Sequence, residues 1–441
     1  MAKIVFDPRA AQAIDERGNA ILESVTQLTT EPAKQSWTPD VAVAATFGVK
    51  DIIGRIDAGQ VDASGAQVAI DFSHEDRRYG LTGKEYQAVH AVVAMFLKDR
   101  EVRSKVSKRT HEGLVRGWIV KRYVGEIKDD LSAHALSEFD GSIYAFRVWV
   151  PIEQLYIQSP IQLGLAEITE ISSVTLQKIA DGAPSTKLRA HFESEFRRYQ
   201  GHAAIVVSWD GDRIRAREAA LEVAESTLGA LSLLSPAALH CEASSGACLW
   251  GSKRVRQATS IYFSDGKMVG SSKGLLGPMP QSLTLDNASI QHFTPILRAL
   301  HLLLTADSSR ILASKVIDAL KVYYRGISSP DPAEKLIYVF VALEMILLRD
   351  SSEVIQDSIA TRMAFLVGRS IEDRRSIIAK VKSGYALRSA FIHHGIQVED
   401  VEAANEFLNV AWHSLVKLLG AAQQHRDQSD LIKALDDRKL Q

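Results

Sequence analysis

The chain has 441 residues, which is long for a single hydrophobic core and fits two or three domains. Its hydrophobic fraction of 46% and charged fraction of 24% are those of an ordinary soluble protein, without repeats or low-complexity segments. A formal net charge of −1 excludes a globally cationic nucleic-acid binder, so any affinity for RNA must come from local patches.

The sequence gives no sign of membrane insertion. The first residues, Met1 to Pro8, contain no apolar signal core. The longest apolar run, Leu336 to Leu348, is shorter than the roughly 20 residues that cross a bilayer, and it contains the carboxylate of Glu344. We therefore expect a cytoplasmic protein that does not enter a membrane.

Helical periodicity begins close to the N-terminus. Apolar residues recur at helical intervals from Arg9 to Thr29 and again from Thr38 to Ala58. The stretch from Asp71 to Gly83 is polar and rich in turn-forming residues. A third helix is expected to begin after Thr82, whose side chain can form a capping box with Glu85.

The most uneven charge distribution lies between Lys98 and Lys128. This segment holds ten lysines and arginines against four acids, with Trp118 and Tyr123 between them. Such a segment can bind RNA through its cations while the aromatic rings stack on bases. It can equally be a solvated helical face whose acidic partners lie elsewhere in the fold, and both interpretations stay open.

The middle of the chain mixes strands and helices. Ile143 to Val150 alternates as a strand, Ala203 to Trp209 is a short apolar strand, and Ala216 to Leu234 is an amphipathic helix. Asp265-Gly266, between two short apolar segments, is the strongest hairpin signal. The turn-like run Gly270 to Gly274 lacks the Walker spacing and is not a phosphate loop.

The two cysteines of the chain also lie in this middle region. Six residues separate Cys241 from Cys248, and His240 precedes the first of them. That interval is unusual for a zinc site, and no fourth ligand is evident nearby. We therefore expect free thiols in or beside a loop, and neither a metal nor another cofactor.

After Asn287 the pattern is helical to the end of the ordered chain, with short connections that favour an antiparallel bundle. The expected helices are Phe293 to Leu304, Ile311 to Tyr324, Ala333 to Leu348, Ile355 to Val367, Ile371 to His394 and Val401 to Gln424. The residues from Arg426 onward are polar and are expected to fray.

These elements predict an α+β protein that is mainly helical, with a mixed α/β middle region and a C-terminal all-α bundle. The expected parts are a helical N-terminal region with the basic segment at 1–140, the mixed region at 141–286, the bundle at 287–425 and a polar tail at 426–441.

The stretch Ser383 to Gly395 carries the residues best suited to chemistry. Arg388 stands four intervening residues ahead of His393, on the last turns of a helix that Gly395 is expected to end. Cleavage of RNA by its own 2′-hydroxyl needs a group that moves a proton near neutral pH and a cation that stabilises charge on the phosphate. An imidazole and a guanidinium supply these two functions.

Spacing alone is weak evidence, because Arg197 and His202 show the same interval across a loop. The residues around Arg388 and His393 are more specific. Tyr385 stands three residues before Arg388, Ser389 directly follows Arg388, and Phe391-Ile392 leads into His393-His394-Gly395. The apolar run from Leu336 to Leu348, whose single carboxylate is Glu344, precedes this stretch in the sequence.

Together these residues resemble the HEPN superfamily of nucleotide-binding and ribonuclease domains, most closely its Apea-like branch, over the last third of the chain. The resemblance implies a metal-independent endoribonuclease that leaves 2′,3′-cyclic phosphate ends, of the class of toxins and phage-defence effectors. It implies catalytic roles for Arg388 and His393 and substrate-binding roles for Tyr385, Ser389 and His394. The family motif reads histidine then glycine, whereas here His394 is inserted before Gly395.

Helix geometry adds a requirement, since residues five apart on an unbroken helix lie about 140° around its axis. Arg388 and His393 therefore do not share a face of a regular helix. HEPN ribonucleases pair two motif helices across a dimer, so the resemblance implies a homodimer with a composite site.

Several alternatives stay open. Cations at a helix C-terminus are favoured by the helix dipole, by about 0.3–1 kcal/mol each, whether or not they act in catalysis. Glu344 is either an ion-pair partner of an arginine such as Arg388 or a second acidic member of the site. The alternative functions are a catalytically silent HEPN scaffold for dimerisation or nucleotide binding, and an RNA-binding adaptor. In the nuclease interpretation the N-terminal two thirds would sense a regulatory protein or a phage-derived trigger.

Overall fold

The computed structural model describes residues 4–28, 69–182, 185–252, 257–264, 267–275, 279–307, 309–350 and 352–439. Helices predominate and most strands fall in the middle of the sequence, which confirms the predicted α+β, mainly helical class. Contacts divide the chain into two compact units. The N-terminal unit comprises residues 1–146 and 209–218, and the C-terminal unit comprises residues 147–208 and 219–441.

The N-terminal unit packs helices against a three-stranded antiparallel sheet of order β1-β3-β2. Its elements are α1 (Pro8–Glu23), β1 (Thr26–Gln27), β2 (Ala69–His74), β3 (Arg77–Thr82), α2 (Gly83–Phe96), α3 (Arg100–Lys105), α4 (Lys108–Tyr123) and α5 (Leu131–Ser142). Val89, Phe96 and Trp118 are fully buried in its core, where one apolar face of each helix meets the others.

The structure defines the turn-rich stretch and the start of the third helix of this unit. The stretch from Asp71 to Gly83 is largely the β2–β3 hairpin, turned by Glu75 and Asp76 at φ of 48° and 60°, as a tight two-residue hairpin requires. Helix α2 does begin after Thr82, but the Thr82 side chain makes no capping hydrogen bond, because the chain enters the helix through Gly83 in a left-handed conformation. The helix expected from Thr38 to Ala58 lies outside the described residues.

A five-stranded sheet of order β6-β7-β8-β4-β9 lies mainly in the C-terminal unit. The elements of this region are β4 (Tyr144–Glu153), β5 (Leu155–Ile157), β6 (Ile161–Leu163), β7 (Ala166–Glu170), α6 (Ser173–Asp181), α7 (Thr186–Phe196), β8 (Ala203–Gly211), α8 (Arg213–Leu231), β9 (Cys248–Leu249), β10 (Gln257–Ser264), β11 (Lys267–Leu275) and β12 (Leu283–Leu285). The strands predicted at Ile143 to Val150 and Ala203 to Trp209 are confirmed as β4 and β8.

The predicted hairpin is confirmed by the antiparallel pairing of β10 with β11. The run Gly270 to Gly274, interpreted from sequence as a turn, instead belongs to β11 and pairs with β10. A separate parallel pair joins β5 to β12.

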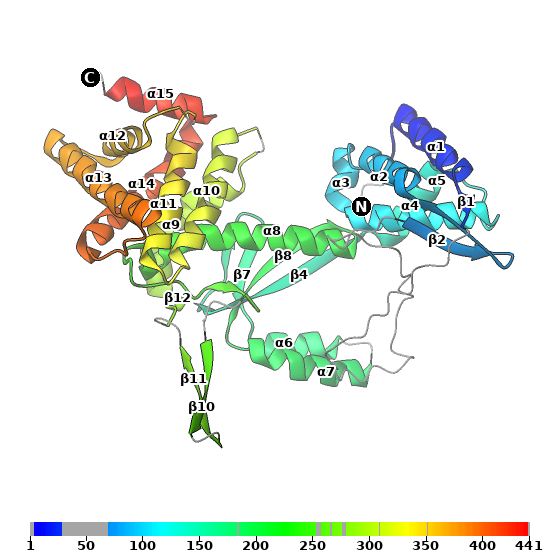
Figure 1. The fold of residues 1–441 in the computed structure, drawn as a ribbon, viewed down its shortest axis with the longest axis horizontal. Coiled ribbons are helices and arrows are strands. Elements are labelled where there is room, and N and C mark those ends of the chain that lie inside the picture. The colour runs from blue at the N-terminus through cyan, green and yellow to red at the C-terminus, as the bar shows by residue number, and fades with distance from the viewer. Residues whose placement is uncertain are drawn as a thin grey trace. The chain divides into compact units, whose positions relative to one another are not determined.

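The remaining helices form the bundle that carries the predicted site, and Figure 1 shows them gathered around one another. They are α9 (Asn287–Leu304), α10 (Ile311–Ile327), α11 (Pro332–Leu347), α12 (Ile355–Val367), α13 (Ile371–His394), α14 (Val401–Gln424) and α15 (Gln428–Arg438). Helix α11 is the most apolar and its buried positions run along its whole length, so it forms the centre against which α13 and α14 pack.

The frayed tail expected from Arg426 is wrong. Residues 428–438 form α15, which buries Leu431, Ile432 and Leu435. Its first turn is capped by Asp427, which accepts a hydrogen bond from the Asp430 amide at 3.0 Å. An apolar face of three residues is enough to dock a helix whose other face is polar.

Candidate functional site

Helix α13 ends at His394, and the chain leaves it through Gly395 in the left-handed conformation with φ of 67°. The Gly395 amide donates to the Phe391 carbonyl at 2.8 Å, the bond of an αL helix end, and the Ile396 amide donates to the Ala390 carbonyl at 3.4 Å. The expected helix end is therefore confirmed. The two histidines occupy the last two helical positions.

Arg388 is held between two helices. Its Nη2 lies 3.7 Å from Oε1 of Glu344 in the last turn of α11, and the two side chains are 17% and 19% exposed. The guanidinium carbon also lies 5.3 Å from the centre of the Tyr385 ring, one turn earlier on α13, within cation–π range. Glu344 is thus the ion-pair partner of Arg388.

This ion pair leaves hydrogen-bonding capacity unused. A separation of 3.7 Å is a charge contact but is longer than a hydrogen bond. Among the described residues, neither Arg388 Nε nor Glu344 Oε1 has a hydrogen-bond partner, although both atoms are buried. Arg388 is therefore held mainly by charge and by the Tyr385 ring, and a phosphate oxygen with better geometry can compete for its N–H groups.

Tyr385 rests on an aromatic platform that sequence reasoning missed. Its ring meets Phe340 of α11 edge-on at 5.5 Å, and Phe340 stacks face to face on Phe407 of α14 at 4.2 Å. Gly384 allows this approach, because a Cβ atom there would come within 2.5 Å of the Phe407 ring. A glycine in the middle of a long helix is the sequence signal that could have indicated such close packing.

His393 and His394 are exposed, and their ring centres lie 6.3 Å apart. Ser389 is half-buried beside Arg388. Because α13 is regular through His394, Arg388 and His393 remain about 140° apart around the helix axis. In the described part of the chain, neither histidine forms a hydrogen bond or ion pair with Arg388. The structure brings Arg388 and Tyr385 together but leaves the imidazoles on a separate surface.

The basic segment forms α3 and α4, and its two aromatic residues do not suit base stacking. Trp118 is fully buried and donates its indole N–H to the Asp129 carbonyl at 2.9 Å. Tyr123 packs at 5.1 Å against Tyr79 and at 5.4 Å against Phe72, from the β2–β3 hairpin. Of the two interpretations left open by the sequence, base stacking therefore loses Trp118 to the core, while Tyr123 is partly buried against the hairpin.

Cys241 and Cys248 are buried free thiols. The neighbouring ammonium of Lys335 is fully buried and donates to the carbonyls of His240 at 2.7 Å, Ala237 at 3.1 Å and Ala243. Burial lowers the pKa of Lys335 to about 8 and raises the pKa of the Cys241 thiol. This lysine joins α11 to the segment that precedes β9, a structural role that sequence reasoning missed.

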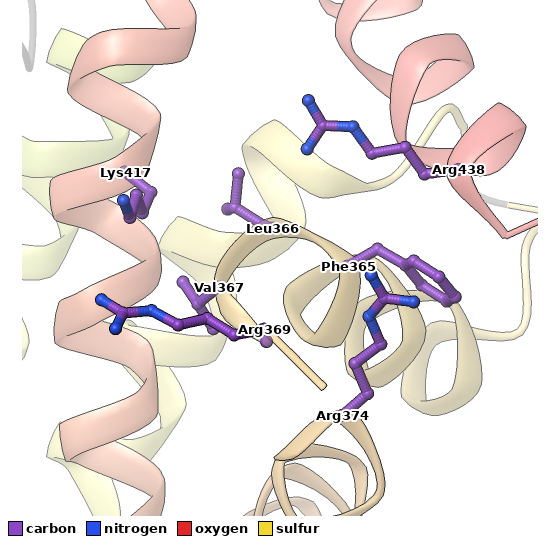
Figure 2. A pocket seen from close by; sticks show the side chains of 8 residues that line it. Phe365, Leu366, Val367, Arg369, Arg374, Lys417 and Arg438 are labelled. Carbon is purple, nitrogen blue, oxygen red and sulfur yellow. The ribbon is translucent and has the colours of Figure 1, made fainter. Parts of the chain in front are cut away.

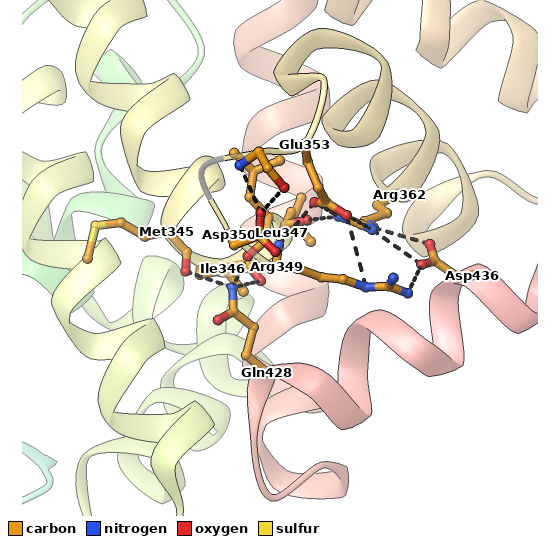
Figure 3. A network of polar contacts seen from close by, with 11 residues as sticks. Met345, Ile346, Leu347, Arg349, Asp350, Glu353, Arg362, Gln428 and Asp436 are labelled. Atoms are coloured by element: carbon orange, nitrogen blue, oxygen red, sulfur yellow. Dashed lines mark hydrogen bonds and ion pairs between the residues drawn. The ribbon is translucent and has the colours of Figure 1, made fainter.

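A second polar cluster, shown in Figure 3, ties α15 to α12. Arg362 binds Glu353 through two hydrogen bonds of 2.6 and 2.7 Å and reaches Asp436 at 3.2 Å. Hydrogen bonds from Arg362 hold the pKa of Glu353 below its ordinary value. At the other end of α15, the Gln428 side chain donates to three carbonyls at the end of α11.

Within the ranges that the structure describes, no group of three or more histidine, cysteine, aspartate or glutamate side chains is placed to hold a metal ion. None of the helices in those ranges is both long enough and apolar enough to span a bilayer. Comparisons of the chain with protein-family models, curated proteins and solved structures find no match.

Proposed function

We propose that the chain is a metal-independent endoribonuclease of the HEPN type, acting as a toxin or phage-defence effector. The observation that carries this proposal is the end of α13. There a half-buried arginine, whose buried Nε has no hydrogen-bond partner among the described residues, precedes two exposed imidazoles by one to two turns, at a glycine-terminated helix end.

In this proposal Arg388 binds the non-bridging oxygens of the scissile phosphate with its fork of N–H groups. One imidazole, from His393, takes the proton of the ribose 2′-hydroxyl as that oxygen attacks phosphorus. A second imidazole, or the same one after proton exchange, gives a proton to the departing 5′-oxygen. The products are a 2′,3′-cyclic phosphate and a 5′-hydroxyl.

The 140° separation requires a second copy of the chain. Ile392 and Ile396 are 45% and 52% exposed, and they flank the two histidines. An apolar surface of this kind can pack against its own copy around a two-fold axis. Such pairing would bring His393 of one protomer towards Arg388 of the other, as the HEPN resemblance implies.

The test compares RNA cleavage by the wild-type protein with that by Arg388→Ala and His393→Ala in the presence of a metal chelator. Both substitutions are expected to reduce cleavage by about 10²-fold or more, the scale of general acid–base and charge-stabilising groups. Arg375→Ala, an exposed arginine of the same helix, and His413→Ala, an exposed histidine of α14, are matched controls. Equal cleavage by all five proteins would refute the assignment, and mass spectrometry of the RNA ends identifies the cyclic phosphate.

One observation favours a second candidate, a HEPN-type scaffold without catalysis. Glu344 balances the charge of Arg388, so the guanidinium already has a partner in the isolated chain. This candidate predicts that the protein forms a dimer and binds a nucleotide or a protein trigger but leaves RNA intact. Because both candidates require a dimer, the cleavage assay separates them, and analytical ultracentrifugation tests the dimer that they share.

A further inference from the structure

A cavity of about 540 Å³ opens in the helical bundle where α12 ends and α13 begins (Figure 2). Its lining residues are Phe365, Leu366, Val367, Gly368, Arg369, Arg374, Lys417 and Arg438. Half of these residues are cationic, and none of the eight carries a carboxylate. The lining is therefore strongly positive, although the whole chain has a formal net charge of −1.

The four cations come from separate parts of the sequence and converge through the fold. Arg369 lies in the α12–α13 connection, Arg374 in α13, Lys417 in α14 and Arg438 in α15. Within the described part of the chain, none of them forms an ion pair within 4.0 Å. The carboxylate of Asp373 accepts a hydrogen bond from the Arg369 backbone amide at 2.9 Å. The side-chain charges of the four lining cations are therefore not neutralised by close ion pairs among the described residues.

The Arg374 side chain is held in place on the wall of the cavity. Its guanidinium carbon lies 4.4 Å from the centre of the Phe365 ring, which fixes the plane of the group. Its Nε atom is buried and has no hydrogen-bond partner among the described residues. An oriented guanidinium with an unused N–H is suited to accept an oxyanion.

Arg438 is also positioned by the surrounding structure. Two residues earlier on α15, Asp436 is held by Arg362 at 3.2 Å and by Arg349 at 2.6 Å (Figure 3). This anchor fixes the last turn of α15 against α12. Arg438 is the last residue of α15, and Figure 2 shows its side chain extending above Leu366.

We propose that this cavity binds a compact anion with two or more phosphate groups, such as a nucleoside triphosphate or a short polyphosphate. Its volume lies in the range of small-molecule sites, about 300–1,000 Å³, and is larger than one phosphate needs. Four cations spread around the wall match several phosphate groups better than one. The site lies at the opposite end of α13 from Arg388 and His393, and the inference does not depend on the proposed nuclease.

The test is isothermal titration calorimetry of the full-length protein with sodium tripolyphosphate, ATP and sodium sulfate at matched ionic strength. Saturable binding of one tripolyphosphate or ATP per chain is expected, with sulfate much weaker. Arg369→Ala and Lys417→Ala remove exposed side chains and are each expected to weaken binding about tenfold, the effect of one lost charge-assisted hydrogen bond. The matched controls are Arg375→Ala on α13 and Lys433→Ala on α15, which replace exposed cations outside the lining.

Tighter binding of ATP than of tripolyphosphate would identify a nucleotide site, and equal binding would identify a polyphosphate site. Either result supports the proposal. Three results would overturn it: no saturable binding, equal weakening in the lining and control variants, or sulfate that displaces tripolyphosphate at equal concentration. Thermal unfolding of each variant without ligand distinguishes lost binding from lost folding.

Discussion

Glu344 approaches Arg388 from the neighbouring helix, with 3.7 Å between its carboxylate oxygen and a guanidinium nitrogen. Glu344→Gln removes the charge and keeps the shape. Because both side chains are partly exposed, we expect the free energy of unfolding to fall by less than about 1 kcal/mol. Affinity for an RNA with a blocked 2′-hydroxyl should rise severalfold, since Arg388 no longer has a competing anion beside it. Fluorescence anisotropy measures this affinity, with Glu372→Gln on the exposed first turn of α13 as the control.

Gly384→Ala should destabilise the bundle. The new Cβ atom would lie 2.5 Å from Cγ of Phe407, a ring fixed by its stacking on Phe340. Overpacking of this kind costs about 1–3 kcal/mol, which outweighs the helix-propensity gain of about 1 kcal/mol. Urea denaturation of the full-length protein provides the measurement.

The matched control for that substitution is Gly420→Ala in α14. A Cβ atom at Gly420 meets nothing within 4 Å, so the substitution should stabilise the protein by about 0.5–1 kcal/mol through helix propensity. Opposite signs for the two variants are expected. If both glycines respond alike, the close contact between α13 and α14 is not what position 384 requires.

The Arg362–Glu353 pair should make stability sensitive to acid. The pKa of Glu353 is lowered in the folded protein, so the folded state holds fewer protons than the unfolded state as the carboxyl titrates. Its contribution is fully present above the unfolded pKa, near 4.5, and is lost as the pH falls through the folded value. Glu353→Gln should lower stability at pH 7 by about 1.5–3 kcal/mol, because Arg362 loses its closest anion but keeps Asp436, and should flatten the profile below pH 5. Chemical denaturation at a series of pH values tests both effects.

Lys335 should make the free energy of unfolding depend on pH in the alkaline range. Burial lowers its pKa to about 8 in the folded protein, whereas the unfolded lysine titrates near 10.5. Between these values the unfolded state binds more protons, so the free energy of unfolding gains up to about 3 kcal/mol from this group as the pH rises.

The measurement compares wild type with Lys335→Met between pH 8 and 10. The variant should be less stable throughout, because three buried carbonyls lose their donor, but its stability should rise less with pH. Parallel pH profiles for the two proteins would show that Lys335 is not the titrating group.

The sequence patterns located the bundle well, because periodicity and end signals agreed there. Helices α12, α13 and α14 have the predicted bounds, and Ser370, Gly395 and Asp400 supply the end signals for α13 and α14. The same reasoning failed for α15, whose short apolar face is hidden in a polar sequence. It left the role of Trp118 open, because composition cannot tell whether an aromatic ring among cations faces solvent or the core.

The candidate sites also combine features that the sequence could predict with features that it could not. The order of Tyr385, Arg388 and His393 along one helix is a local property, which a sequence motif can carry. The Arg388–Glu344 pair, the Phe407 platform and the cationic cavity each depend on distant segments that meet through packing. No local pattern contains that information, so these features became visible with the structure.

Gly395 has a left-handed backbone conformation, so the end of α13 should respond differently to L and D residues at this position. An L-alanine there has room for its methyl group but must adopt an angle that costs about 1–2 kcal/mol, whereas a D-alanine favours that angle. A semisynthetic protein with the mirror-image residue should therefore keep the exit path that places Ile396 beside the histidines. The handedness of one backbone position thus sets the shape of the surface on which the imidazoles stand.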